Sequence, residues 1–114
     1  MASDIGFVEY VVDQMGDAGA ISQRKMFGEY AVYCDGKVVA LITDDALFVK
    51  PTRAGRAFIG QPVEAPPYPG ANPYFAIADK LDDRRWLSTL IRATADELPA
   101  PQPKKPRAKK PASG

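Results

Sequence analysis

The feature that most constrains the fold of this chain is the run of residues 24–50. Nearly every second side chain in it is apolar, and it contains two short segments with aspartate that are typical of turns. Asp35-Gly36 lies between two alternating runs, and this is the strongest short signal for a β-hairpin, because both turn positions need a positive φ. Asp44-Asp45 indicates a second two-residue turn. The run is therefore predicted to form two hairpins that share a strand.

Two-residue turns also fix which residues face one another across the strands. The first turn is predicted to pair Cys34 with Lys37 and Tyr30 with Leu41, and the second to pair Leu41 with Phe48. One face of the sheet is then almost wholly aliphatic, and helices must cover it to keep it out of water. This predicted core face comprises Ala31, Tyr33, Val38, Ala40, Ile42, Leu47 and Val49.

The other face of the predicted sheet is mixed in character. It comprises Tyr30, Val32, Cys34, Lys37, Val39, Leu41, Phe48 and Lys50. Loops could cover this face, or it could meet a partner, and the sequence leaves both open. A contiguous exposed apolar patch often marks an interaction site. The candidate interaction face is therefore assigned to Tyr30, Val32, Leu41, Phe48 and Lys50.

Helical and strand patterns precede this run. Ser3 is predicted to cap a first helix that ends at Gly16, and residues 21–26 indicate a strand. Gly28 is either a tight turn or a bulge, and the sequence does not distinguish the two. The apolar stripe of the first helix comprises Ile5, Phe7, Val8, Val11, Val12 and Met15.

The second half of the chain adds two helices and a strand. Thr52 is predicted to cap a short helix that ends at Gly60. Five prolines in residues 61–73 predict an extended loop without regular structure, and residues 74–78 predict a short strand. Asp82 is predicted to cap the last helix, which Pro99 ends. The buried face of that helix comprises Trp86, Leu87, Leu90, Ile91, Thr94 and Leu98.

Together these elements predict an α+β fold: an antiparallel sheet of about four to five strands built on consecutive hairpins, packed with N- and C-terminal helices and one short helix. Residues 1–99 are expected to form one domain. Residues 100–114 alternate proline with basic residues and lack aromatic or branched aliphatic side chains, so this tail is predicted to be disordered.

Charge divides the chain in the same place. Residues 1–98 carry 10 basic and 14 acidic side chains, a net charge of −4, whereas the tail carries five cations and no acid. If the protein contacts nucleic acid, the tail is the expected element, with weak and salt-sensitive binding. The candidate contact residues are Lys104, Lys105, Arg107, Lys109 and Lys110.

Several kinds of chemistry are excluded by composition. The chain has no histidine and one cysteine, so it has no imidazole base, no Cys-His pair and no thiolate cluster. It also lacks the glycine-rich phosphate-binding motifs. Cys34 is interpreted as an apolar filler, and Asp44-Asp45 and Asp82-Asp83 as a turn and a helix cap rather than metal ligands. We therefore expect no enzyme activity, cofactor or metal.

The sequence also bears on location. No apolar run approaches the roughly 18 residues of a membrane helix, and the N-terminus lacks the pattern of a secretory signal. A single cysteine agrees with a reducing compartment. The expected location is cytoplasmic, with no membrane partner.

Two segments, RKMFGEYAVYCDGKVVALITDDALFVK and PPYPGANPYFAIADKLDDRRWLSTLIRATADELPAP, resemble the N-terminal domain of the TfoX (Sxy) competence regulators over about residues 3–99. The most specific matches are residues 26–28, Tyr30, the turn of residues 33–37, residues 47–50 and residues 68–70. The resemblance implies an α+β domain associated with transcriptional control of DNA uptake, in which relatives act with the cyclic-AMP receptor protein. It implies no catalytic residues.

These observations favour a non-enzymatic regulatory or protein-interaction module, whose partner is a component of the transcription machinery by family resemblance, or a second copy of the chain. Nucleic-acid association through the tail and an unrecognised small-ligand site are the alternatives.

Overall fold

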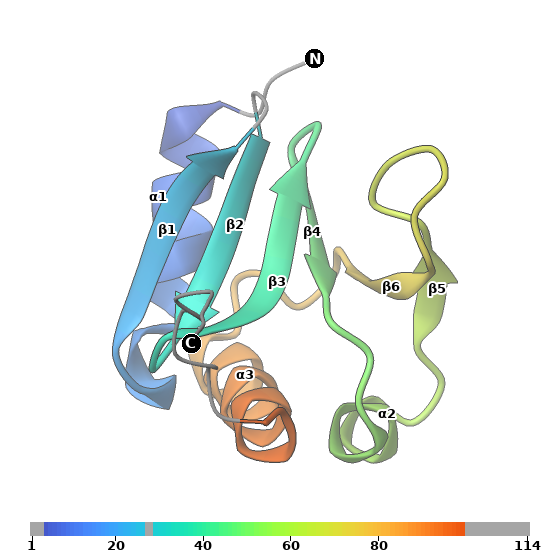
Figure 1. The fold of residues 1–114 in the computed structure, drawn as a ribbon. Coiled ribbons are helices and arrows are strands. Elements are labelled where there is room, and N and C mark those ends of the chain that lie inside the picture. The colour runs from blue at the N-terminus through green and yellow to red at the C-terminus, as the bar shows by residue number, and fades with distance from the viewer. Residues whose placement is uncertain (1–3, 27–28, 100–114) are drawn as a thin grey trace, which may run out of the picture.

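The structure is a computed structural model, and it describes residues 4–26 and 29–99. One antiparallel sheet runs through these residues in the strand order β1-β2-β3-β4-β6-β5 (Figure 1). The strands are β1 (Ile21–Met26), β2 (Glu29–Cys34), β3 (Lys37–Thr43), β4 (Ala46–Val49), β5 (Val63–Ala65) and β6 (Tyr74–Ile77). The helices are α1 (Ile5–Gln14), the 3₁₀ turn η1 (Gly16–Ala18), α2 (Arg53–Ile59) and α3 (Arg84–Glu97).

The helices pack on one face of the sheet and form a single hydrophobic core with it. Val8 and Val11 of α1 and Leu87, Leu90 and Ile91 of α3 are fully buried in this core. Figure 1 shows α1 behind β1 and β2, with α3 and α2 at the lower end of the sheet. The side of β2, β3 and β4 that faces the viewer carries no helix, and we call it the open face. The predicted α+β class is confirmed, with six strands instead of four to five.

Both predicted turns are two-residue connections. Asp35 and Gly36 have φ values of 52° and 85°, and Asp44 and Asp45 have values of 51° and 59°. Positive φ at both positions matches the right-handed twist of the flanking strands. The register of the second hairpin is confirmed, because Leu41 faces Phe48 as predicted.

The first hairpin departs from prediction after two pairs. Cys34 faces Lys37 and Tyr33 faces Val38, but Val32 then faces Ala40 instead of Val39. Val39 is thus an extra residue, a β-bulge, and it shifts every later pair by one, so Tyr30 faces Ile42 instead of Leu41. Because side chains alternate along a strand, a shift by one residue exchanges the two faces of β2.

The predicted division of the faces is therefore wrong for β2 and the start of β3. The helix-covered face holds Tyr30, Val32, Cys34, Val39, Ala40, Ile42, Leu47 and Val49, while the open face holds Ala31, Tyr33, Val38, Leu41 and Phe48. Val39 and Ala40 are both fully buried, which agrees with two bulge residues that turn toward the same core.

The helix caps differ from prediction by one position at two helices. Asp4 caps α1 by accepting the N–H of Phe7, and Ser3 lies outside the described residues. Asp83 caps α3 by accepting the N–H of Trp86 at 3.0 Å, because a capping side chain reaches the third residue after it. The predicted Thr52 cap of α2 is confirmed.

The proline-rich segment contains more structure than predicted. Val63–Ala65 forms β5, which pairs with β6 at the edge of the sheet. Pro62 and Pro66 flank these three residues and do not interrupt them, and an edge strand tolerates neighbouring prolines. The strand predicted at residues 74–78 is confirmed through Ile77.

Besides the Ser3 cap, three sequence predictions lie outside the described residues: the conformation at Gly28, the disorder of residues 100–114, and the candidate nucleic-acid contacts within that tail. Within residues 4–26 and 29–99, no helix combines the length and apolar character needed to cross a membrane.

Candidate binding site on the open sheet face

A hollow of about 660 Å³ lies on the open face, at the end of the sheet where β2 begins and β3 ends. This volume is within the range of small-molecule and side-chain binding pockets. Its walls come from β1, β2, β3 and the loop between β5 and β6. The lining residues are Met26, Glu29, Tyr30, Ala31, Leu41, Thr43, Asp44, Pro67, Tyr68 and Pro69.

The floor of the hollow is part of the sheet and is therefore rigid. Ala31 and Leu41 face one another on neighbouring strands, and Thr43 ends β3. The Thr43 hydroxyl is buried and donates to the carbonyl oxygen of Pro67 at 2.7 Å. This hydrogen bond fixes the β5–β6 loop against the sheet, so the hollow is formed before any ligand binds.

The outer wall exposes large apolar side chains. Tyr68 is 55% exposed and Met26 is 41% exposed. The N–H of Ala71 donates to the carbonyl oxygen of Tyr68 in a turn in which Gly70 has a φ of 90°. The turn presents Tyr68 between two prolines at the mouth of the hollow.

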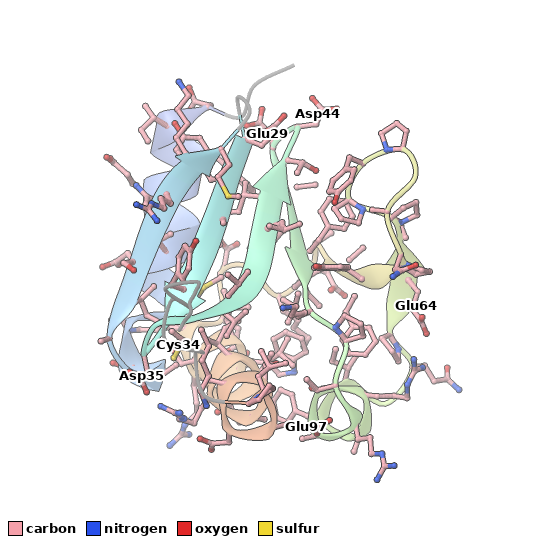
Figure 2. All side chains as sticks on the ribbon, viewed as in Figure 1. Glu29, Cys34, Asp35, Asp44, Glu64 and Glu97 are labelled. Carbon is pink, nitrogen blue, oxygen red and sulfur yellow. The ribbon has the colours of Figure 1, made fainter. Side chains whose placement is uncertain are left out.

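One end of the hollow is acidic. Glu29 at the start of β2 and Asp44 in the β3–β4 turn lie next to each other at the top of the sheet (Figure 2). An oxygen of the Glu29 carboxylate accepts the backbone N–H of Asp44 at 3.2 Å. Next to Asp44, the Asp45 carboxylate accepts the N–H of Asp4 at 2.7 Å and so ties the same turn to α1. The hollow thus combines apolar walls with two carboxylates, of which that of Glu29 is held by the backbone of Asp44.

The five residues of the predicted interaction face do not share a surface. Val32 is fully buried under the helices, whereas Leu41 lines the hollow and Phe48 lies beside Leu41 on the open face. Tyr30 is half-buried, packs against the core and also borders the hollow. Lys50 follows β4 and does not line the hollow. The bulge at Val39 explains this separation, and alternation alone could not reveal it.

Sequence reasoning did not place Met26 and residues 67–69 at a site. Their contact depends on the β5–β6 loop folding back on the sheet, which no local pattern encodes. In the sequence, Tyr68-Pro69-Gly70 stands out only through the family resemblance.

The polar contacts at the opposite end of the sheet hold elements of the fold together. Arg92 of α3 donates to the Asp35 carboxylate at 2.9 Å and to the carbonyl oxygen of Ala18 at 2.7 Å. A hydrogen bond from the backbone of Ala20, and then Arg92, hold the pKa of Asp35 below its usual value. These contacts join the first hairpin turn to α3 and η1.

Cys34 is fully buried at this end, with its sulfur 3.9 Å from the carbonyl oxygen of Ala18. Burial raises the pKa of the Cys34 thiol, which keeps it protonated and unreactive. Its position agrees with its interpretation as an apolar filler.

The adjacent acidic pairs have structural partners. Asp44 and Asp45 form a turn, Asp83 caps α3, and the hydroxyl of Tyr10 donates to the Asp82 carboxylate. Within residues 4–26 and 29–99, no three His, Cys, Asp or Glu side chains are grouped so that they could hold a metal ion.

A single antiparallel sheet with helices on one face and a hollow on the other defines a small α+β domain. The sequence matches the family model of the TfoX N-terminal domain over residues 13–98, and the chain therefore belongs to this family. It is also 42% identical over 111 residues to an uncharacterized 12.7 kDa protein from the 5′ region of trpE in Spirochaeta aurantia, and the match covers 97% of this chain and 96% of that protein.

Part of the family resemblance lies at the hollow, whereas residues 33–37 and 47–50 do not line it. Met26, Tyr30, Tyr68 and Pro69 belong to three separate parts of the sequence, and all four line it. The hollow therefore brings together the resemblance segments around Met26 and Tyr30 and the segment around Tyr68, which are about 40 residues apart in the sequence.

Proposed function

We propose that this protein is a non-enzymatic regulatory module that binds another protein through its open sheet face. The observation that carries the proposal is the preformed hollow, which combines a rigid floor at Ala31 and Leu41 with exposed apolar side chains at Met26 and Tyr68. Exposed aromatic side chains beside a fixed pocket are typical anchors of protein interfaces.

The chemistry of the face supports binding and not catalysis. Its lining residues offer one hydroxyl with a hydrogen-bond partner, two phenols and two carboxylates, among apolar side chains. No imidazole or thiol is available to activate a nucleophile there. By family resemblance, the partner class is the transcription machinery.

A pair of matched variants tests this proposal. Tyr68 and Val63 are both strongly exposed, at 55% and 68%, but only Tyr68 lines the hollow. Wild-type protein, Tyr68→Asp and Val63→Asp would be immobilised, exposed to cell lysate at physiological salt, and the retained proteins identified by mass spectrometry. A partner retained by the wild type and Val63→Asp but lost by Tyr68→Asp is the expected result.

Equal retention by all three proteins would show that the hollow is not part of the interaction surface. Failure of the wild type to retain any partner would contradict the proposal. Sedimentation velocity on the wild type tests whether the partner is a second copy of the chain. If the partner is another copy of the chain, the sedimentation coefficient rises with concentration, and Tyr68→Asp suppresses this rise.

The volume of the hollow favours one second candidate, a small apolar ligand with a cationic group. The walls would take the apolar part, and Glu29 and Asp44 would attract the cation. A thermal-shift screen of amines that raises the melting temperature of the wild type but not of Tyr68→Asp would support this candidate. If no compound stabilises the wild type, this second candidate function is contradicted.

A further inference from the structure

We infer that the open face binds the chain's own basic segment, residues 100–114, within the same molecule, with its lysines directed to the acidic end of the hollow. This inference rests on the proposed function for its consequence, because a docked segment would shield the surface that a partner needs. Binding of the segment itself can be tested without any partner.

The described chain ends at Pro99, directly after α3, which lies at the lower end of the sheet. Lys37, the first residue of β3, donates from its ammonium group to the carbonyl oxygens of Ala95 and Leu98 at 2.7 and 3.1 Å. These bonds hold the end of α3 beside the first hairpin turn. In Figure 1 the last turn of α3 comes toward the viewer, which is the side of the sheet without helices. Lys37 pairs with Cys34 and so belongs to the helix-covered face, which means that the segment has to pass the lower edge of the sheet to reach the open face.

The length of the segment is sufficient for this path. The hollow lies at the other end of β3, and a strand of seven residues spans roughly 20 Å. Fifteen residues reach at most about 50 Å when extended. The basic residues 104–110 fall in the middle of this reach, so they can arrive at the hollow without strain.

Apolar side chains mark the path from α3 to the hollow. Tyr33 and Val38 face one another across β2 and β3 on the open face, and both are half-buried. Leu41 and Ala31 follow and form the floor of the hollow. Prolines favour extended segments that dock on aromatic and aliphatic surfaces, and the segment supplies prolines at positions 101, 103, 106 and 111.

Charge gives the path a direction. The segment carries five cations and no acid, whereas residues 1–98 carry a net charge of −4. Glu29 and Asp44 lie at the far end of the hollow. Arg24 faces the same side from β1, opposite Ala31, and it directs a cationic segment away from β1 and toward the β3–β4 turn.

Paramagnetic relaxation in the full-length chain provides the test. A spin label would be attached through Ser113→Cys, because the buried thiol of Cys34 is protected from modification. The expected result is selective broadening of the amide signals of Leu41, Thr43 and Tyr68, with little effect on α1. At about 1 M salt, where the Debye length is ~3 Å, the broadening should largely disappear.

Charge variants provide the control. Glu29→Gln with Asp44→Asn removes both charges but keeps an oxygen for the N–H of Asp44, and it should reduce the broadening. Glu9→Gln with Asp13→Asn removes two charges from α1, behind the sheet, and should leave the broadening unchanged. Equal effects of both double variants would overturn a specific role for the acidic end.

Two further outcomes would overturn the inference. Broadening that is absent or spread evenly over the domain would show that the segment does not dock on the open face. Broadening of an isotope-labelled, unmodified chain by a separate spin-labelled chain would show that the segment of a second copy is the occupant. Either result leaves the lysate experiment with Tyr68→Asp unaffected, so failure of this inference is distinct from failure of the proposed function.

Discussion

Glu97, in the last turn of α3, caps the start of α2: one oxygen of its carboxylate accepts the backbone N–H of Arg53 at 2.9 Å. The other oxygen accepts the N–H of Ala54 at 2.8 Å, and Figure 2 places Glu97 between the two helices. A helix of seven residues is unstable alone, and its first N–H groups need partners. The end of α3 thus stabilises α2 and holds it in place.

The Glu97 cap should make stability depend on pH. The backbone N–H groups of Ala54 and then Arg53 hold the pKa of Glu97 below its usual value. A carboxylate with a lowered folded-state pKa stabilises the fold above its unfolded pKa, which is about 4.3, and loses this effect as pH falls through the folded value. Thermal unfolding of wild type and Glu97→Gln should therefore differ most above about pH 5 and converge at lower pH. A difference that is constant with pH would contradict this assignment.

Gly55→Ala should destabilise the protein although alanine favours helices. A β-carbon at this position would lie 2.8 Å from the Thr52 hydroxyl oxygen and 3.3 Å from a methyl group of Leu90. The Thr52 oxygen accepts the N–H of Gly55, so the clash disturbs the cap itself. Overpacking of about 1–3 kcal/mol exceeds the propensity gain of about 1 kcal/mol. Urea unfolding should show a lower free energy of unfolding, and a gain would show that α2 can shift away from α3.

Leu90→Ala should lower the free energy of unfolding by about 2–5 kcal/mol, because it removes a buried side chain and leaves a cavity. Leu90 of α3 is fully buried, and its side chain lies against Gly55 of α2. Val63→Ala is the control, since Val63 is 68% exposed, and it should change the free energy by less than about 0.5 kcal/mol. Urea titrations with equal slopes would measure both. A loss below about 0.5 kcal/mol for Leu90→Ala would contradict the packing of α3.

The bulge at Val39 can be tested with Val32→Glu and Leu41→Glu. In the register without a bulge, Val32 and Leu41 would share one face of the sheet. In the structure Val32 is fully buried under the helices, and Leu41 lies on the open face. Val32→Glu should therefore unfold the protein, because it buries an unpaired charge, whereas Leu41→Glu should keep a native circular dichroism spectrum.

A related variant, Phe48→Glu, should behave like Leu41→Glu, because Phe48 faces Leu41 and is half-buried on the open face. It should remain folded and weaken partner binding or self-association in sedimentation velocity. A native spectrum with unchanged association would place the interface away from Phe48, and an unfolded Phe48→Glu would show that the open face is internal.

The sequence by itself determined the elements whose causes are local. Asp35-Gly36 and Asp44-Asp45 formed two-residue turns, because few residue pairs tolerate a positive φ at both positions. Thr52 capped α2, and the apolar spacing of α3 identified Leu87, Leu90 and Ile91 as buried. The second hairpin register followed from its turn alone. Each of these results depends on interactions within a few residues.

Only the tertiary structure decided which face of β2 is buried and where the candidate site lies. The bulge at Val39 leaves no signature in a run of apolar residues, since Val38, Val39 and Ala40 fit either register equally well. The hollow depends on the hydrogen bond between Thr43 and Pro67, which are 24 residues apart. Long-range packing determines these arrangements. The bulge lets Val32, Val39 and Ala40 all join the core formed with α1 and α3, and this removes their apolar surface from water.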